Sequence, residues 1–558
     1  MTRHRWNVET PMRDGTLLRA DIYFPESGVD GGPYPTVLQR TPYSKQGPVY
    51  VEGARYLAAR GYACVLQDVR GRHDSGGEWT PFVSEGADGY DTVEWIAEQP
   101  WSTGRIGTMG GSYGGWIQWA LASEKPPHLT TMVSTATCGA YAEELPTHNG
   151  CVMLVMLGWL NLVSGRVMQN ADLVPNWPDV FRHLPLRDMP TVLGRDGARW
   201  QEWLDHPSLD EYWRRLRLDD DFAHIDVPVL HITGWWDDDQ PGAMHMYRGM
   251  AAGSPRSADQ SLVIGPWDHA GTRLPRQVLG GVDMGPTAVH DPLDIHRRWF
   301  DKWLKDEPAE ATAAARLFLT GVKTWVDADA FPPSGTTEVV WHLDSGGRAN
   351  SVMGDGTLGP KLPAGAAEDV YRYDPADPVP AVIDDNFYSP NVVETPLDHR
   401  FKHRRDDVLV YTSEPASDEL TVVGHAEVRL HAATDGRDTD WFVALHDVAP
   451  NDSSMVLCDG RMRARYNEDL SAPTLREPGQ VYEYVIRTGA MGHVVLPGHR
   501  LRLTVTSSDF PVWDRNLNTG ESIADGIEMR VATNRVRHTE AHPSTLRLPV
   551  APAGALNP

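Results

Sequence analysis

The chain has 558 residues, and 41% of them are hydrophobic, so it is long enough for several domains and apolar enough to fill their cores. This composition excludes a single small binding module and a wholly disordered chain. With 51 Lys and Arg against 76 Asp and Glu, the formal net charge is −25, a field that repels phosphate backbones and anionic lipid head groups. We therefore expect no nucleic acid and no membrane among its partners.

Short apolar runs rich in β-branched residues alternate with helical patterns in the first part of the chain. Strands are predicted at 36–40, 62–68, 105–109 and 129–134, and helices at 51–61 and 88–99. The same alternation resumes with strands at 227–234 and 261–267 and an amphipathic helix at 295–305. Strand–helix repetition predicts an α/β fold with a parallel sheet covered on both faces, and we assign this domain to residues 1–141 and 225–320.

Two other regions have a different pattern of hydrophobic and polar residues. Residues 142–224 are rich in Trp, Leu and Met without strand alternation, which predicts an inserted helical cap, and its long apolar run 151–163 predicts a buried helix. Residues 321–558 contain short alternating segments separated by Gly, Pro and Asp, which predict an all-β jelly-roll sandwich domain. The predicted strands of this domain are 337–343, 407–413, 419–434, 440–448, 482–488, 499–508 and 526–533.

A candidate nucleophile follows the predicted strand 105–109. The segment from Gly110 to Gly115 reads GGSYGG and leads into a helical segment, with Ser112 at its centre. A Gly-x-Ser-x-Gly between a strand and a helix is the nucleophile elbow, in which the glycines permit a tight turn that lifts the serine hydroxyl above the sheet. In a chain with 51 glycines the same spacing also arises by chance, and Ser112 is then a bystander in a glycine-rich turn.

A serine nucleophile needs a base to take its proton and a carboxylate to orient that base. Where this elbow occurs, the order along the chain is Ser, acid, His, with the acid and the His after later strands. Asp237, Asp238 and Asp239 follow the strand 227–234, and His269 follows the strand 261–267. We predict His269 as the base and Asp237, nearest the strand end, as its acid. Asp238 and Asp239 are interpreted as solvated or helix-N-terminal charges.

The oxyanion of a tetrahedral intermediate needs hydrogen-bond donors. The backbone N–H of Tyr113 is one of them by the geometry of the elbow. Tyr43, in the loop after strand 36–40, offers a second donor in its hydroxyl, or else packs beside a proline. Trp116, Trp159 and Trp236 are the candidate substrate-binding residues, and ordinary packing is the alternative for each of them.

Several motifs together resemble the cocaine-esterase-like and X-Pro dipeptidyl-peptidase family of α/β-hydrolases. The matching stretches are RTPYSK (40–45), QDVRGRHDSGGEW (67–79), the segment 85–115, GWWD (234–237), GPWDH (265–269), HRRWFDKWLK (296–305), TDWFVALHDV (439–448), LCDGRMRARY (457–466) and SSDFPVWDRNLNTG (507–520). The resemblance spans nearly the whole chain. It implies Ser112 as nucleophile, His269 as base and Asp237 as its partner, with the Tyr43 hydroxyl joining the Tyr113 amide in the oxyanion hole.

The same resemblance implies that Asp68, Arg70 and Asp88 hold loops beneath the site. His73 stands where relatives usually carry glycine, so that loop is expected to differ in shape. The α-amino-acid ester hydrolase branch tends to place a carboxylate shortly after the nucleophile. Gly114, Gly115 and Trp116 occupy those positions here, which weakens the case for an aminoacyl substrate.

We expect a serine hydrolase that cleaves a small-molecule ester or amide through an acyl-enzyme, with no cofactor and no metal. A carboxylesterase or acyl hydrolase is the first hypothesis. An X-Pro-type dipeptidyl-peptidase or amidase is the second, and it needs a carboxylate for a free amino terminus, for which Glu143 and Glu144 are candidates. A binding protein with an idle triad is the third.

The sequence says less about the cellular compartment and the oligomeric state. The four cysteines are widely spaced, with no pair at metal or redox spacing, and the early sequence shows no secretory signal, so we expect a cytoplasmic protein. The sequence leaves the oligomeric state open, a homo-oligomer included.

Overall fold

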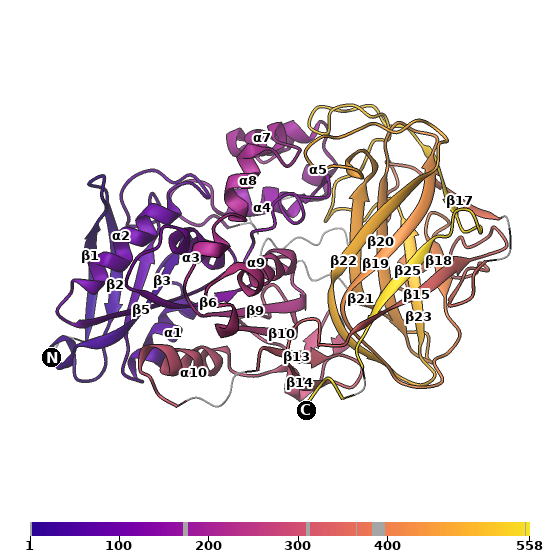
Figure 1. The fold of residues 1–558 in the computed structure, drawn as a ribbon. Helices are drawn as coiled ribbons and strands as arrows, with labels where there is room; N and C mark the ends of the chain where they lie inside the picture. The colour runs from indigo at the N-terminus through magenta and orange to yellow at the C-terminus, as the bar shows by residue number, and fades with distance from the viewer. Residues whose placement is uncertain are drawn as a thin grey trace.

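The computed structural model describes residues 3–170, 177–308, 313–363, 365, 367–381, 397–552 and 554–557. Figure 1 shows an N-terminal α/β domain, a C-terminal domain of strands beside it, and a group of short helices over the junction of the two. The predicted fold class is confirmed: a mixed α/β domain with a large parallel sheet precedes an all-β sandwich domain. No helix in the described ranges combines the length and the apolarity needed to cross a membrane.

The N-terminal domain is built on one ten-stranded sheet. Its strands are β1 (His4–Pro11), β2 (Leu17–Tyr23), β3 (Tyr34–Thr41), β4 (Ala63–Asp68), β5 (Ser102–Gly111), β6 (Leu129–Thr135), β9 (Val229–Trp236), β10 (Gln260–Asp268), β13 (Ala315–Leu319) and β14 (Thr324–Ala328). Their order across the sheet is β1-β2-β4-β3-β5-β6-β9-β10-β13-β14. The seven strands from β4 to β13 are parallel, and only the edges are antiparallel. Because helices cover both faces, strands such as β4 are buried along their whole length.

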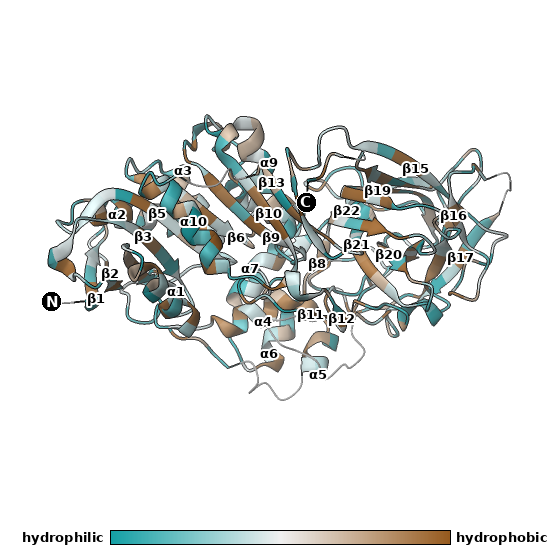
Figure 2. Cartoon of the chain, turned by 90° about the horizontal axis from the view of Figure 1, so that it is seen from below, coloured by the Kyte–Doolittle hydropathy of each residue, from teal (hydrophilic) through white to brown (hydrophobic). Residues whose placement is uncertain are grey.

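Five helices cover the two faces of this sheet. They are α1 (Pro48–Ala58), α2 (Glu85–Ala97), α3 (Tyr113–Ser123), α9 (Gln240–Gly253) and α10 (Pro292–Leu304). Alternate residues of β3 enter different cores, since Val37 packs with α1 and α10 while Leu38 packs with α2 and α3. In Figure 2, α10 is largely teal and the strands behind it are brown, as expected for an amphipathic helix on an apolar sheet.

The cap contains the helices α4 (Val155–Leu162), α5 (Trp177–Arg182), α6 (Met189–Val192), α7 (Ala198–Asp205) and α8 (Glu211–Arg217). The helix predicted over 151–163 begins later than expected, because its first residues form the strand β8 (Cys151–Val152), which pairs with β7 (Thr147–His148). The Val152 amide donates to the Asp514 carboxylate at 2.7 Å, and the Asp514 amide donates to the Val152 carbonyl at 2.9 Å. These bonds to the C-terminal domain replace the first bonds of a helix.

The C-terminal domain is a sandwich of mainly antiparallel strands, with one parallel pair, β16 and β18. Its described strands are β15 (Thr337–Asp344), β16 (Thr357–Gly359), β17 (Glu368–Tyr373), β18 (Leu409–Thr412), β19 (Leu420–Thr434), β20 (Asp440–Val448), β21 (Ser454–Arg463), β22 (Tyr482–Val495), β23 (Arg500–Thr506), β24 (Ala532–Arg537) and β25 (Thr545–Val550). The prediction of a strand at 526–533 is wrong for most of its length, since β24 begins at Ala532. Ile527 and Met529 are exposed, so the alternation there is not set by a core.

Along the chain, β14 is the last strand of the N-terminal sheet and β15 is the first strand of the C-terminal domain. Because β13 and β14 extend the first sheet beyond residue 320, we propose to place the domain boundary after Ala328 instead of at 321. A buried ion-pair network ties the sandwich to the cap: Arg463 of β21 contacts Asp440 and Asp514, each at 2.8 Å. The same Asp514 carboxylate accepts the bond from Val152 of the cap hairpin.

Candidate active site

Ser112 lies at the sharp turn between β5 and α3. Its backbone angles, φ 62° and ψ −130°, are strained for a residue with a side chain. The Ser112 amide donates to the carbonyls of Thr135 and Ala136 at the end of β6, at 3.0 and 2.9 Å. A Cβ at position 110 would lie 2.3 Å from the Gly114 carbonyl oxygen, so only glycine fits there. The turn therefore has the form of a nucleophile elbow.

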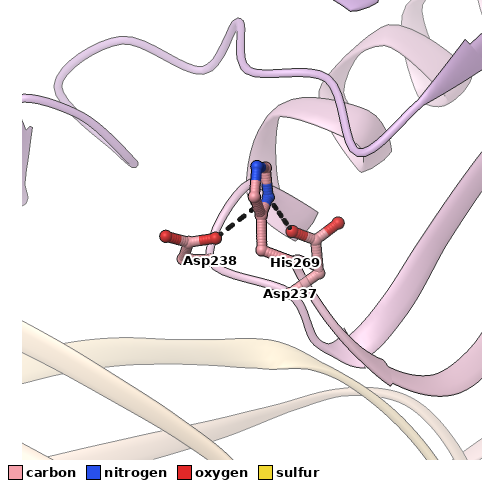
Figure 3. Close-up of side chains that lie close together, drawn as sticks. All are labelled: Asp237, Asp238 and His269. Carbon is pink, nitrogen blue, oxygen red and sulfur yellow. Dashed lines mark hydrogen bonds and ion pairs between the residues drawn. The ribbon is translucent and has the colours of Figure 1, made fainter. Parts of the chain in front are cut away.

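The predicted acid and base approach each other from adjacent parallel strands. Asp237 follows β9 and His269 follows β10, and strand ends of one direction meet at the same edge of a sheet. The Asp237 Oδ1 lies 2.8 Å from the His269 Nδ1 (Figure 3). The Asp237 side chain has no exposed surface, and it also accepts bonds from the Thr233 hydroxyl at 2.8 Å and the Asp239 amide at 3.1 Å. Its orientation is thus fixed before any substrate binds.

A second carboxylate contacts the same imidazole nitrogen. The Asp238 Oδ1 lies 3.1 Å from the His269 Nδ1, on the opposite side from Asp237 in Figure 3, and the Asp239 Oδ2 lies 3.8 Å away. Burial by itself lowers the pKa of His269, but these three carboxylates outweigh it and raise that pKa well above its usual range, with Arg273 acting against them.

The sequence interpretation of Asp238 is therefore incomplete. Asp238 is partly solvated, with a side chain 43% exposed, but it also contacts the candidate base. Asp239 does precede α9, as expected of a helix-N-terminal charge, although its side chain makes no capping bond. The sequence did contain a signal for this contact. Three consecutive carboxylates follow the strand 227–234, and the candidate base His269 follows the neighbouring strand 261–267.

Asp237, Asp238 and His269 also form a group whose ligand atoms lie within 4.8 Å of one another, which is compatible in size with a metal site. In this group both carboxylates are directed at one imidazole nitrogen, which already takes part in the bond to Asp237. A triad would account for this arrangement without a further ligand, and the group is therefore a candidate for proton transfer.

Two oxyanion-hole candidates flank Ser112. The Tyr43 hydroxyl accepts a hydrogen bond from the Trp159 indole at 2.9 Å, which leaves its own proton for another acceptor. Burial raises the pKa of Tyr43 well above its usual range, so the hydroxyl stays protonated beside Ser112. The Tyr113 amide is at the start of α3, where helix amides have no partner within the helix. Both groups are hydrogen-bond donors of the kind that an oxyanion hole uses.

Two cavities meet at Ser112. The first, which we call the acidic pocket, has a volume of about 110 Å³. Its lining residues are Tyr43, Phe82, Ser112, Tyr113, Cys138, Leu145, Val155, Met156, Trp159, Trp236, Asp238, Asp239, Asp268, His269 and Ala270. The second, which we call the outer pocket, has a volume of about 810 Å³ and also includes Tyr43, Ser112 and His269 in its lining.

The three tryptophans predicted to bind substrate have different positions. Trp159 lines both pockets, and Trp236 lines the acidic pocket. Trp116 is buried in the core, where its indole donates to the Leu216 carbonyl at 3.2 Å, and it lines neither pocket. We therefore exclude Trp116 as a substrate contact. It lies one helical turn into α3, on the face that packs under the cap.

The loops beneath the site carry the contacts expected of scaffold residues. Asp68 pairs with buried Lys45 at 2.8 Å, and Arg70 pairs with Asp88 at 2.6 Å. His73 has a positive φ of 47°, and its amide donates to a carbonyl of the cap segment at Arg166, 2.8 Å away. This hydrogen bond therefore connects the loop at His73 to the cap segment.

Glu143 and Glu144, the candidate ligands for a free amino terminus, line neither pocket. Glu144 is buried and accepts three backbone N–H bonds, from Gly139, Ala140 and Gly242, at 2.8 to 3.0 Å. Glu143 pairs with Arg217 at 3.3 Å. Both carboxylates therefore stabilise loops. The acidic residues in the pocket lining beside Ser112 include Asp238 and Asp239, which follow β9.

Comparison with known proteins gives a consistent result along the chain. Residues 14–271 match the family described as X-Pro dipeptidyl-peptidase (S15 family), and residues 308–547 match the X-Pro dipeptidyl-peptidase C-terminal non-catalytic domain. The chain is 35% identical to the cocaine esterase of Rhodococcus sp. over 578 aligned positions, which cover 98% of both proteins.

Solved structures agree with this assignment. An aminopeptidase from the marine sediment archaeon Thaumarchaeota archaeon superimposes with a TM-score of 0.88 at 27% identity, covering 99% of this chain and 97% of that one. An α-amino acid ester hydrolase gives a TM-score of 0.87 at 27% identity with the same coverage. The chain belongs to the cocaine-esterase-like and X-Pro dipeptidyl-peptidase family of α/β-hydrolases, and it is a serine hydrolase of ester or peptide bonds.

Proposed function

We propose that Ser112, His269 and Asp237 form a catalytic triad and that the protein is a carboxylesterase acting through an acyl-enzyme. One observation carries this proposal: an imidazole bound to a buried carboxylate lines the same two cavities as the serine of a strained elbow. A serine, a histidine and an aspartate in these relations are the groups that acyl transfer requires.

The proposed reaction has two halves. In the first, His269 Nε2 accepts the Ser112 proton while the serine oxygen attacks the ester carbonyl, and the imidazolium then donates that proton to the leaving alcohol. In the second, His269 takes a proton from water as the water oxygen attacks the acyl-enzyme, and the imidazolium then returns that proton to the Ser112 oxygen as the acid leaves. The Tyr43 hydroxyl and the Tyr113 amide stabilise the oxyanion in both halves, and Asp237 holds the imidazole in the required tautomer.

A second function, cleavage of aminoacyl esters or amides, is favoured by one observation. Asp238 and Asp239 line the acidic pocket beside Ser112, where a carboxylate attracts a substrate ammonium. Two solved relatives are named as an aminopeptidase and an α-amino acid ester hydrolase. The glycines after Tyr113 still argue against this function, because they offer no carboxylate at that position.

A matched pair of esters separates the two functions. The 4-nitrophenyl esters of butyrate and of α-aminobutyrate differ only by the ammonium group, and release of nitrophenol reports kcat/KM for both. For a carboxylesterase we expect the butyrate ester to be hydrolysed at least as efficiently. If the aminobutyrate ester is preferred by about tenfold or more, which is about 1.4 kcal/mol, the aminoacyl function is correct.

Replacing Tyr43 with phenylalanine tests the oxyanion hole. Loss of one oxyanion donor is expected to lower kcat by about 10²- to 10³-fold with little change in KM, because the bond strengthens only in the transition state. Tyr90→Phe, on the outer face of α2, removes a tyrosine hydroxyl away from the site and serves as control. A change below threefold in the Tyr43 variant would assign this residue to packing.

We also propose the cytoplasm as the compartment. All four cysteines, Cys64, Cys138, Cys151 and Cys458, are buried free thiols, as expected in a reducing environment.

A further inference from the structure

Arg273 presents an unpaired charge to the active site. It lies four residues after His269 and lines the outer pocket. Its Nη1 is buried and has no hydrogen-bond partner, and no carboxylate of the described residues forms an ion pair with its guanidinium. Arg276, in the same loop, pairs with Asp268 at 2.5 Å. A buried donor without a partner costs free energy, so an anion that reached Arg273 would be bound favourably.

The guanidinium lies directly against the nucleophile's turn. A Cβ at position 111 would be 2.6 Å from the Arg273 Nη1, so the glycine before Ser112 leaves the space that the guanidinium occupies. An anion bound there would belong to the same molecule as the bond that Ser112 attacks.

The rest of the outer pocket is mainly apolar. Its apolar lining residues include Val49, Tyr50, Met109, Leu162, Met168 and Leu293. The volume of about 810 Å³ is in the range of small-molecule sites. This combination favours a substrate with an apolar body and one anionic group.

The acidic groups in the described lining of this pocket do not pair with the Arg273 guanidinium. Asp291 accepts the capping bond of α10 from the Leu293 amide at 2.9 Å. Glu52 is exposed on α1, where water screens its charge. Besides His269, the other basic residues of the described lining are Arg276, which is paired with Asp268, and His296, whose pKa is lowered by burial to about 4.

We propose that Arg273 binds a carboxylate of the substrate, so that the preferred substrates are esters or amides carrying a carboxylate besides the scissile bond. The planar guanidinium can bind both oxygens of a carboxylate in one orientation. This inference rests on the proposed function, in which Ser112 is the nucleophile. The carboxylate belongs to the acyl group or to the leaving group, and the test separates these two sources.

The test uses two matched substrate pairs. On the acyl side, mono-4-nitrophenyl adipate is compared with 4-nitrophenyl heptanoate, and on the leaving-group side, 4-acetoxybenzoate with 4-acetoxybenzamide. The ratio of kcat/KM for the anionic and the neutral member is measured on the alkaline plateau of the pH profile, with spontaneous hydrolysis subtracted. We expect the native protein to prefer the anionic member of one pair, and that pair identifies the source.

In Arg273→Gln the anionic-to-neutral ratio should fall about 10- to 100-fold, mainly through KM, as for the loss of a charged hydrogen bond. Arg273→Lys should restore part of it, because it keeps the charge without the planar fork. Arg55→Gln removes one positive charge from the exposed face of α1 and should leave the ratio unchanged.

Two results would overturn the proposal: no preference for an anion in either pair, or an equal fall for both members of a pair in Arg273→Gln. The second result would mean that Arg273 supports the reaction of both substrates equally and does not bind the anion. Failure of the proposed function looks different, because the native protein would then hydrolyse neither the neutral nor the anionic esters.

Discussion

Replacing Ser112 with alanine is expected to lower kcat for any ester substrate about a millionfold while leaving the fold intact. The alanine retains the elbow but removes the only atom that attacks the carbonyl. His269→Ala should cost about as much, and the double variant should be hardly worse than either single variant, because the triad acts as one unit. Initial rates with an activated ester, together with circular dichroism, measure activity and folding.

A fluorophosphonate probe provides a second measurement on the same proteins. It should label Ser112 in the native protein and nothing in Ser112→Ala. Ser123→Ala, at the end of α3, is the matched control and should keep both activity and labelling. If Ser112→Ala retained most of its activity, or labelling were absent from the folded native protein, the triad would be wrong and a binding function would have to be considered.

The two carboxylates at the His269 Nδ1 should differ greatly in their effect on catalysis. Asp237→Asn is expected to lower kcat about 10⁴-fold, because the buried amide favours the wrong tautomer of the imidazole. Asp238→Asn should lower kcat on the alkaline plateau by less than about tenfold, since the partly exposed Asp238 supplies charge while Asp237 keeps the orientation. The opposite order would identify Asp238 as the triad acid.

The pH profile gives Asp238 a separate signature. His269 acts as a base only when neutral, and its raised pKa means that it stays protonated above the usual histidine range. In the native protein kcat/KM should therefore rise with pH at a midpoint above about 6.5. Asp238→Asn removes a charge that raises this pKa, so its midpoint should move to lower pH. An unchanged midpoint would contradict the assigned role of Asp238.

The parallel sheet and the elbow were predictable because their signals are local. Strands buried on both faces are continuous apolar runs, and the glycines around Ser112 are required by close backbone contacts that neighbouring residues make. The positions of Asp237 and His269 followed from strand order alone.

The remaining features depend on contacts between distant segments. Val152 is in a strand because Asp514 of the other domain binds it, and no pattern within the apolar run reveals that. Trp116 is in the core because the cap covers that face of α3. The charge of Arg273 is visible in the sequence, but its lack of a partner appears only when all surrounding carboxylates are placed.

Residues 308–547 match a domain described as non-catalytic, yet this domain contacts segments that line the cavities at Ser112. The Trp236 indole donates to the Val456 carbonyl of β21 at 3.1 Å, and the cap hairpin that precedes α4 is anchored by the Arg463 network. Under the proposed function, we expect both domains to influence substrate selectivity. A laboratory search for altered substrate range should include sandwich residues beneath Trp236 and Val152, since shifts there reach the walls around Ser112 without touching the triad.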